Sequence, residues 1–342
     1  MLCQRFYIIG FSLWILLVTT TYAQEKPLTD LSGGQLGKIF FSSTNNPTFK
    51  SVLTGDSPGE PVTIFGTLSM PKNTSAKVPA VVILPGVAGA TDHYFEVARA
   101  LNDIGFAAFV VDSHKPRNIQ GASQAFKNLA QSMRIADAYA ALRLLSTHPR
   151  IHKDRITLMG WGRGGSVALF ASSERVRRSL SVSDLRFAGT IVYYPCCLRQ
   201  IRNIDFTGTP ILMLLAEKDN VTLASICTDY AQRANASGAD VKIVVYKDAY
   251  CAFDFSSLSG QVIPYPALSD FTKCRHKYLQ LEDDGTWFCP YTKKRADKLS
   301  DFGDLTADCK VDGGGIIGGP EEARTESIKE YQAFLKRVCS LP

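Results

Sequence analysis

The sequence of 342 residues predicts an α/β protein with a mostly parallel sheet and helices on both faces. Continuous apolar runs such as Val78–Leu84 and Phe106–Val111 have the length and composition of strands that are buried on both faces. Segments with apolar residues at helical spacing separate these runs. Strands that alternate with helices require crossovers that lay each helix across the sheet, so the sheet is expected to be parallel.

The remaining elements follow the same rhythm. Residues before 62 are predicted to be a polar leader. Further strands are predicted at 62–70, 156–159, 187–194, 211–215 and 241–246. Helices are predicted at 93–102, 122–145, 167–172, 224–234 and 322–338, with 122–145 as one long amphipathic helix.

Residues 255–318 lack strong periodicity and carry Cys274, Cys289 and Cys309. A structureless loop of this length is uncommon unless it is functional or tied down. We therefore expect a disulfide-stapled insertion before the last helix, on the rim of the sheet. A mobile excursion without contact to the site is the alternative.

Residues 1–23 have the pattern of a signal peptide. Arg5 precedes the apolar run 6–18, and small residues follow at 21–23. A membrane anchor is disfavoured because the run is too short to span a bilayer. The sequence therefore predicts a secreted or periplasmic protein, with residues 24–342 as a single domain and no stable membrane anchor after cleavage.

The cysteine content and the charge further restrict the class of protein and its partners. Eight cysteines follow residue 23, an even number that predicts disulfides in an exported chain without defining their connectivity. No C-x-x-C pair is present and histidines are few, so neither a metal site nor a cofactor is expected. The net charge is +6, with acids and bases interspersed, which argues against nucleic acid as a partner.

The most informative segment is 160–165, Gly-Trp-Gly-Arg-Gly-Gly, between a predicted strand and a predicted helix. This arrangement is typical of a nucleophile elbow, G-x-Nuc-x-G. With its neighbours, it makes the chain resemble the dienelactone hydrolase family of α/β-hydrolases, particularly exported bacterial members. The resemblance covers about 60–255 and the last helix, and it rests on segments 84–89, 112–117, 160–165, 193–195, 216–222 and 249–254.

The resemblance implies an α/β-hydrolase fold and three catalytic positions. These are Gly162 for the nucleophile, Asp219 for the acid and Cys251 for the histidine. Glycine has no nucleophile, and cysteine cannot replace the imidazole that accepts a proton and returns it. The triad is therefore degenerate, and ordinary hydrolysis is not expected. Glycine also relaxes a turn that strains other residues.

Two residues have alternative interpretations. Cys251 is expected in a disulfide or as an inert thiol. The alternative is a reactive thiolate, which a nearby carboxylate disfavours. His114 follows a strand and is expected on the surface, although it can approach the pocket rim. Ser166 is expected to point into helix packing.

Part of the site survives in this interpretation. Backbone N–H groups of Val87 and Arg163 can form an oxyanion hole. Arg117, Lys115 and Trp161 are candidate ligand contacts, by analogy.

We therefore expect a non-catalytic member, a pseudoenzyme, that binds a small molecule or a protein partner. A carboxylate is one candidate ligand. The alternatives are an ester or lactone hydrolase with a rearranged site, or a non-hydrolytic enzyme that uses Asp219 and the oxyanion loop.

Overall fold

The computed structural model describes residues 26–340, except 57–58, 73–75, 181–183, 207 and 303–304. The predicted signal peptide, residues 1–23, lies outside the described residues. Among those that are described, no helix is long and apolar enough to cross a bilayer.

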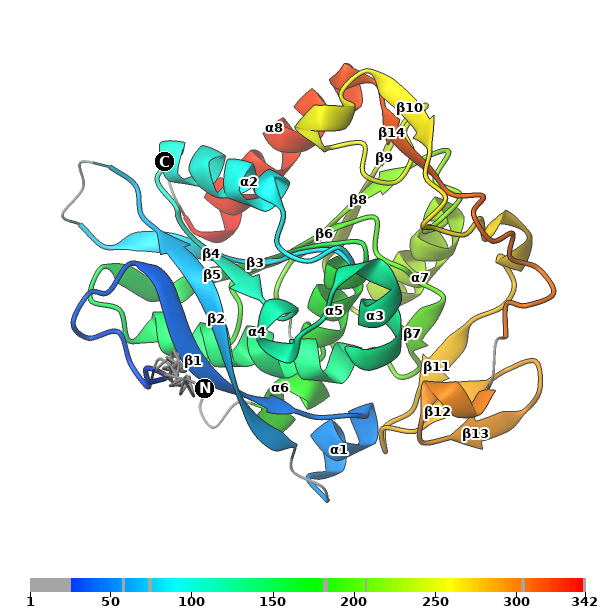
Figure 1. Cartoon of the computed structure of the whole chain (residues 1–342), viewed down its shortest axis with the longest axis horizontal. Coiled ribbons are helices and arrows are strands. Elements are labelled where there is room, and N and C mark those ends of the chain that lie inside the picture. Colours follow the sequence, from blue (N-terminus) through cyan, green and yellow to red (C-terminus); the bar gives the residue numbers. More distant parts are fainter. Residues whose placement is uncertain are drawn as a thin grey trace, which may run out of the picture.

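A twisted sheet of eight strands forms the centre of the molecule (Figure 1), in the order β1-β2-β4-β3-β5-β6-β8-β9. From β4 to β9 the neighbours run parallel, whereas β1–β2 and β2–β4 are antiparallel. The prediction of a mostly parallel sheet is confirmed. The strands are β1 Gly37–Asn45, β2 Glu60–Ser69, β3 Val78–Leu84, β4 Ala107–Asp112, β5 Ile151–Trp161, β6 Thr190–Tyr193, β8 Ile211–Ala216 and β9 Val241–Tyr246.

Helices cover both faces of this sheet. Alternate residues of β3 divide between two cores because successive side chains of a strand point to opposite faces. Val82 and Leu84 belong to the core that also contains residues of α4, α5 and α7, and Val81 and Ile83 belong to the core that also contains residues of α2 and α8. The helices are α1 Phe49–Thr54, α2 Asp92–Asp103, α3 Gly121–Asn128, α4 Gln131–Ser146, α5 Arg163–Ala171, α6 Glu174–Leu180, α7 Ala224–Ala236 and α8 Glu321–Val338.

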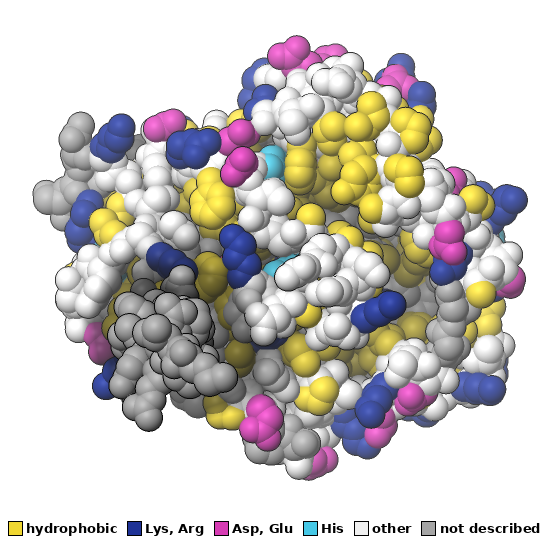
Figure 2. Space-filling view, in the orientation of Figure 1, with side chains coloured by type: hydrophobic (Ala, Val, Ile, Leu, Met, Phe, Trp, Pro, Cys, Tyr) yellow, Lys and Arg dark blue, Asp and Glu magenta, His cyan; other side chains and the backbone are white. Residues whose placement is uncertain are grey.

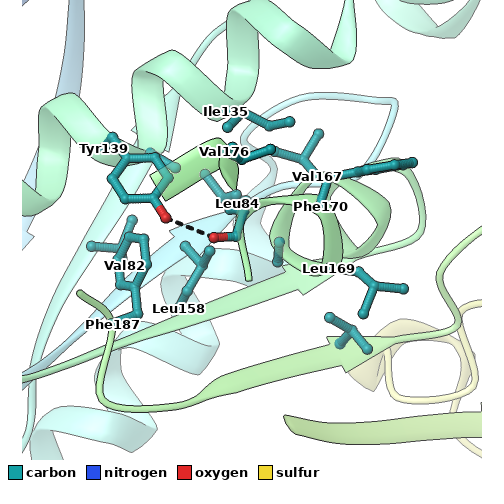
Figure 3. Close-up of a cluster of buried hydrophobic side chains, with 14 of the residues drawn as sticks. Val82, Leu84, Ile135, Tyr139, Leu158, Val167, Leu169, Phe170, Val176 and Phe187 are labelled. Carbon is teal, nitrogen blue, oxygen red and sulfur yellow. Dashed lines mark hydrogen bonds between the residues drawn. The ribbon is translucent and has the colours of Figure 1, made fainter. Parts of the chain in front are cut away.

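Figure 3 shows the first of these cores. Leu84 and Leu158 come from the sheet, and Val167 comes from α5. The hydroxyl of Tyr139, on α4, donates a hydrogen bond to the carbonyl of Ala171 at 2.7 Å. The buried phenol thus satisfies its polar atom while it fixes α4 against the end of α5.

The prediction of a single helix at 122–145 is wrong. The structure has two helices, α3 and α4, separated at Leu129 and Ala130, both of which have extended backbone. Leu129 is buried against Ile119 and Ala125, so tertiary packing outweighs the continuous helical pattern there. Nor is α4 amphipathic, because most of its residues are buried between the sheet and its neighbours.

The part of the predicted polar leader that the structure describes contains β1 and α1, which the sequence analysis did not predict. β1 pairs with β2 along its full length, and its inward residues include Ile39, Phe41 and Ser43. Ser43 is polar yet buried because its hydroxyl donates to Asp137 at 2.5 Å. A buried polar residue on the inner face hides the alternating pattern by which a strand is recognised.

The insertion predicted at 255–318 has more structure than its sequence suggests. β10 Gln261–Pro264 pairs with β14 Ile316–Gly319 near α8. A second sheet, in the order β13-β12-β11-β7, joins β11 Leu279–Leu281, β12 Trp287–Cys289 and β13 Lys294–Ala296 to β7 Arg199–Ile201.

Short 3₁₀ helices lie at η1 Lys115–Arg117, which follows β4, and within the insertion at η2 Ser256–Leu258, η3 Thr272–Cys274 and η4 Leu299–Phe302.

Contacts with the main core hold the insertion in place. Trp287 is buried against Phe49 and Phe170, which a mobile excursion could not provide. By contrast, all four residues of β10 are exposed, and Figure 2 shows hydrophobic side chains gathered on this face over β10 and β14.

Disulfides are present, as predicted, but they involve only four of the eight cysteines. Cys197 pairs with Cys227, and Cys274 pairs with Cys309 within the insertion. Cys196, Cys251, Cys289 and Cys339 are unpaired.

Replacement of Cys197 and Cys227 by alanine should lower the free energy of unfolding by about 3–4 kcal/mol, because the bridge closes a loop of 30 residues. Urea denaturation monitored by circular dichroism measures this change. Cys196→Ala removes the adjacent unpaired thiol and is the matched control, with a change below about 1 kcal/mol expected. An equal loss in both variants would contradict the prediction.

Candidate functional site

A tight turn at Gly162 joins the end of β5 to the start of α5. Gly162 has φ of 49° and ψ of −113°, in the positive-φ region that glycine adopts freely. A Cβ built on this residue would meet no atom within 4 Å. The turn therefore has the geometry of a nucleophile elbow, with open space where a side chain would project.

The glycines around the turn allow strand and helix to approach closely. A Cβ on Gly164 would overlap the carbonyl oxygens of Leu84 and Pro85, and a Cβ on Gly160 would overlap the carbonyl of Gly164. The elbow is thus packed directly on the end of β3. Any side chain at Gly160 or Gly164 would force these elements apart.

The two amides predicted to form an oxyanion hole belong to Val87 and Arg163. Arg163 is the first residue of α5, no side chain caps that helix, and the first amides of a helix have no partner within it. On the facing loop, the Gly86 amide donates to the Tyr94 hydroxyl at 2.7 Å, and the Val87 carbonyl lies 3.2 Å from Nε2 of His114. These contacts fix the loop beside the elbow.

His114 is buried, contrary to the prediction of a surface residue. Its exposed fraction is 4%. Burial, followed by the charge of Arg134, lowers the pKa of His114 to about 4. The ring is therefore neutral near pH 7, and because a carbonyl only accepts, Nε2 carries the proton that it donates to Val87. The turn that follows β4 places this side chain under the Val87 loop.

Asp219 lies in the loop after β8, as predicted. Its Oδ1 accepts from the amides of Val221 and Thr222 at 2.8 Å each, and its Oδ2 accepts from the Thr222 hydroxyl at 2.6 Å. Burial raises the pKa of Asp219 above its ordinary value, although these hydrogen bonds act in the opposite direction. Its own loop thus takes up much of the carboxylate's capacity to accept hydrogen bonds.

Cys251 follows β9 and is buried without a disulfide partner, in agreement with the inert-thiol interpretation. Burial, and then the nearby carboxylates of Asp219 and Asp254, raise the pKa of this thiol well above its ordinary value. The structure therefore brings Asp219 and Cys251 together, but in surroundings that keep the thiol protonated.

A buried polar cluster around Asp254 was not found from the sequence. Its Oδ2 accepts from Nε1 of Trp161 at 2.6 Å and lies 3.2 Å from Nε2 of His93, and its Oδ1 accepts from the Tyr194 hydroxyl at 2.6 Å. The His93 ring is stacked on Phe255 at 3.8 Å between centroids. This cluster links the elbow to the segment that contains Cys251. Asp254, which follows Cys251 by three residues in the sequence, was the residue that could have indicated this cluster.

The serines near the elbow differ in their surroundings. Ser166 lies in the packing of α5, as predicted: its hydroxyl donates to the Gly162 carbonyl at 3.2 Å and accepts from the Cys196 amide at 2.8 Å. Ser113 is buried, and its hydroxyl has no hydrogen-bond partner among the described residues.

The three residues predicted to contact a ligand differ in their surroundings. Arg117 donates to both carboxylate oxygens of Asp137 at 2.9 Å each, and Trp161 is buried and bonded to Asp254. Both side chains thus make hydrogen bonds within the fold, and their role as ligand contacts stays a prediction. Lys115 is exposed and stays a candidate.

Three buried or half-buried arginines near the elbow were not expected as a group. Arg134 is 1% exposed and donates to the Pro85 carbonyl. Arg163 donates to the Leu129 carbonyl at 2.7 Å, and Arg199 lies close enough to depress the pKa of Arg163, which burial lowers to about 9. They come from α4, α5 and β7, and no sequence spacing connects them.

Among the described residues, no group of three histidine, cysteine or acidic side chains is placed to hold a metal ion. A surface hollow of about 430 Å³ is lined by Glu174, Arg175, Arg178, Ser179 and Asp205. Its charges largely pair with one another, and it lies on α6, beyond the end of α5 opposite to Gly162.

Fold and elbow together define a protein of the α/β-hydrolase class. The chain belongs to the dienelactone hydrolase family, whose model matches residues 64–270. This match contains the Gly86–Val87 loop, the elbow, Asp219 and Cys251, and it extends into the insertion.

The chain is similar to one protein in sequence and to another in structure. A Bradyrhizobium protein named a probable 2-oxo-3-(5-oxofuran-2-ylidene)propanoate lactonase is 25% identical over 189 residues, which cover 52% of this chain and 75% of that protein. A dienelactone hydrolase-like promiscuous phosphotriesterase from metagenomic libraries superposes with a TM-score of 0.50 at 16% identity, over 70% of this chain and 93% of that one. At this identity the second match shows the fold alone.

Alanine substitution of two glycines at the elbow should distinguish the cost of backbone strain from the cost of steric overlap. Gly162→Ala places a methyl in open space at positive φ, so a loss of about 1–2 kcal/mol is expected. Gly164→Ala overlaps the backbone of β3, and a loss above about 3 kcal/mol, or failure to fold, is expected. Chemical denaturation of both variants measures this, and equal losses would contradict the geometry.

Thiol alkylation should distinguish the free cysteines. At about pH 8, iodoacetamide should modify Cys196, which is half-buried, long before Cys251, which is buried and has a raised pKa. Peptide mass spectrometry follows both sites in one sample. Rapid labelling of Cys251 in the native protein would show that its thiol is accessible and ionised; labelling in urea is the control.

Proposed function

We propose that this chain is a non-hydrolysing member of the dienelactone hydrolase family that binds a small molecule at the elbow. The observation that carries the proposal is Gly162. The residue at the apex of the turn has the backbone conformation of the family's nucleophile position and no side chain to attack a carbonyl.

The positions of the acid and the base support this proposal. A catalytic base must accept a proton near neutral pH, and a buried thiol whose pKa is raised cannot do so. Asp219 receives three hydrogen bonds within its own loop, and no hydrogen bond to a histidine is found among the described residues. The three positions of the triad therefore provide neither a nucleophile nor a base that can accept its proton.

A rearranged triad has little geometric support. Ser166 is held by backbone groups of Gly162 and Cys196, so its hydroxyl is committed to α5 packing. His93 has a carboxylate neighbour in Asp254, yet its ring is stacked on Phe255, and no hydrogen bond joins it to a serine or cysteine in the described part of the chain. The uncapped amides of the elbow remain as a binding feature.

The proposal includes export from the cytosol. Two disulfides support it, because such bonds persist mainly in oxidising compartments. The name of the Bradyrhizobium relative specifies a lactone that carries a propanoate group. Ligands of that class are the first to screen by thermal shift.

Restoring both missing side chains tests the assignment of the site. The double variant Gly162→Ser with Cys251→His should hydrolyse p-nitrophenyl acetate measurably, whereas the wild type and either single variant should stay near the rate without protein. This follows because the members of a triad act as a unit. Initial rates, with thermal unfolding as a check on folding, give the comparison.

A third substitution controls for surface reactivity. Adding Asp219→Asn to the active double variant should lower its rate by at least about 10²-fold, because the acid orients the histidine. Wild-type protein that turns over esters at enzyme-like rates, and loses this ability when another hydroxyl is removed, would refute the proposed function.

A further inference from the structure

The insertion lies directly beside the loops that carry the acid and the histidine positions. Asn220, the residue after the acid position, donates from its side-chain amide to the Gly314 carbonyl at 2.8 Å, and its Oδ1 accepts from the Ile316 amide at 3.0 Å. The Gly318 amide donates to the Cys251 carbonyl at 2.8 Å. The strand β14 is therefore attached to both loops at once, and β10 is its outer neighbour.

The exposed surface of this hairpin carries no charge. Residues 255–269 and 313–320 contain no charged side chain, although charged residues make up 20% of the chain. β10 and the residues that directly follow it are exposed, and Val262, Ile263 and Tyr265 are 49%, 38% and 41% exposed. Figure 2 shows the hydrophobic side chains gathered there. Contiguous exposed apolar patches mark sites of interaction.

The acids of the site and of the neighbouring chain do not interrupt this surface. Asp219 and Asp254 are buried, and both carboxylates accept hydrogen bonds from buried neighbours. Glu96 and Asp312 accept hydrogen bonds from serines at either end of the uncharged segment 255–269. A ligand that covers the hairpin therefore meets apolar side chains between charged borders.

The register of the hairpin defines which face of β10 continues the core of the site. Ile263 lies directly opposite Ile317, so the two side chains share a face. Ile317 is buried in the same core as Cys251. Tyr265 follows Ile263 by two residues and continues this face, whereas Val262 lies on the other one. The apolar core of the site thus extends, uncovered, onto Ile263 and Tyr265.

The outer edge of β10 does not favour the addition of another strand. The Tyr265 amide donates to the carbonyl of Gly315, directly opposite, at 2.7 Å. Because hydrogen-bonded positions alternate along an antiparallel pair, Val262 and Pro264 turn their backbone groups away from β14. Proline has no N–H, so this edge of β10 offers one donor, at Val262. Recognition through side chains is therefore favoured over strand addition.

We propose that Ile263 and Tyr265 form an apolar subsite that extends the elbow site and takes an uncharged alkyl or aryl group of the ligand. This inference rests on the proposed function and specifies the class of its ligand. The insertion provides the subsite because β14 holds β10 beside the loops of the acid and histidine positions. Small-molecule sites are mostly apolar with a few polar groups, and here the uncapped amides of the elbow are the polar groups.

Displacement of an uncharged fluorescent probe, N-phenyl-1-naphthylamine, from the purified protein tests the inference. Primary alcohols from pentanol to octanol should displace the probe, and each added CH₂ group should lower the dissociation constant about two- to fourfold because it leaves water. Ile263→Ser and Tyr265→Ser should each weaken octanol at least about threefold and leave pentanol within about twofold.

Val262→Ser is the matched control. It removes an apolar side chain of similar exposure from the opposite face of the same strand, and the dissociation constants of all the alcohols should stay within about twofold. Thermal unfolding of the three variants verifies that each of them is folded.

Three results would overturn the inference: no displacement by octanol, an affinity that is independent of chain length, or equal losses in Val262→Ser and Ile263→Ser. A dimer in sedimentation velocity, or flotation with phosphatidylcholine vesicles, that Ile263→Ser abolishes would overturn it as well and assign this face to a second copy or to a membrane. Affinity without chain-length dependence would leave the proposed function intact, because the elbow would still hold a ligand. Ester hydrolysis by the wild type would instead refute the proposed function, whatever the affinity for octanol.

Discussion

The close approach of β5, its turn and α5 to the end of β3 is the constraint on which the site depends. Gly160 and Gly164 permit this approach, since a methyl group on either would overlap neighbouring backbone. The approach forces the chain to reverse at Gly162 with positive φ, and it leaves the first amides of α5 uncapped. The same backbone can present a nucleophile or, with glycine at the apex, an empty position beside oriented N–H groups.

Buried charge is arranged around this backbone in two ways. On one side Arg117 and Asp137 form a fully paired bridge between the η1 turn and α4. On the other, Arg134 is buried, and two of its nitrogens, Nε and Nη1, have no hydrogen-bond partner among the described residues.

Periodicity predicted the parallel strands and most helices because buried strands and amphipathic helices leave repeating apolar patterns. It failed where tertiary contacts outweighed local preference. Leu129 interrupts a continuous helical pattern because its side chain is buried beside Ile119 and Ala125. β1 was missed because Ser43, on its inner face, is satisfied by a carboxylate 94 residues away. Trp287 fixes an insertion that has no periodic pattern.

The sequence by itself determined the family resemblance, the glycine at position 162 and the absence of a histidine at position 251, because these depend on residue identity in an ordered motif. Only the tertiary structure decided which charges are paired and which thiols are bridged. Arg134, Arg163 and Arg199 come from separate elements, and folding alone brings them to one turn. Electrostatic interactions and hydrogen bonds depend on distance in space, which a one-dimensional pattern does not contain.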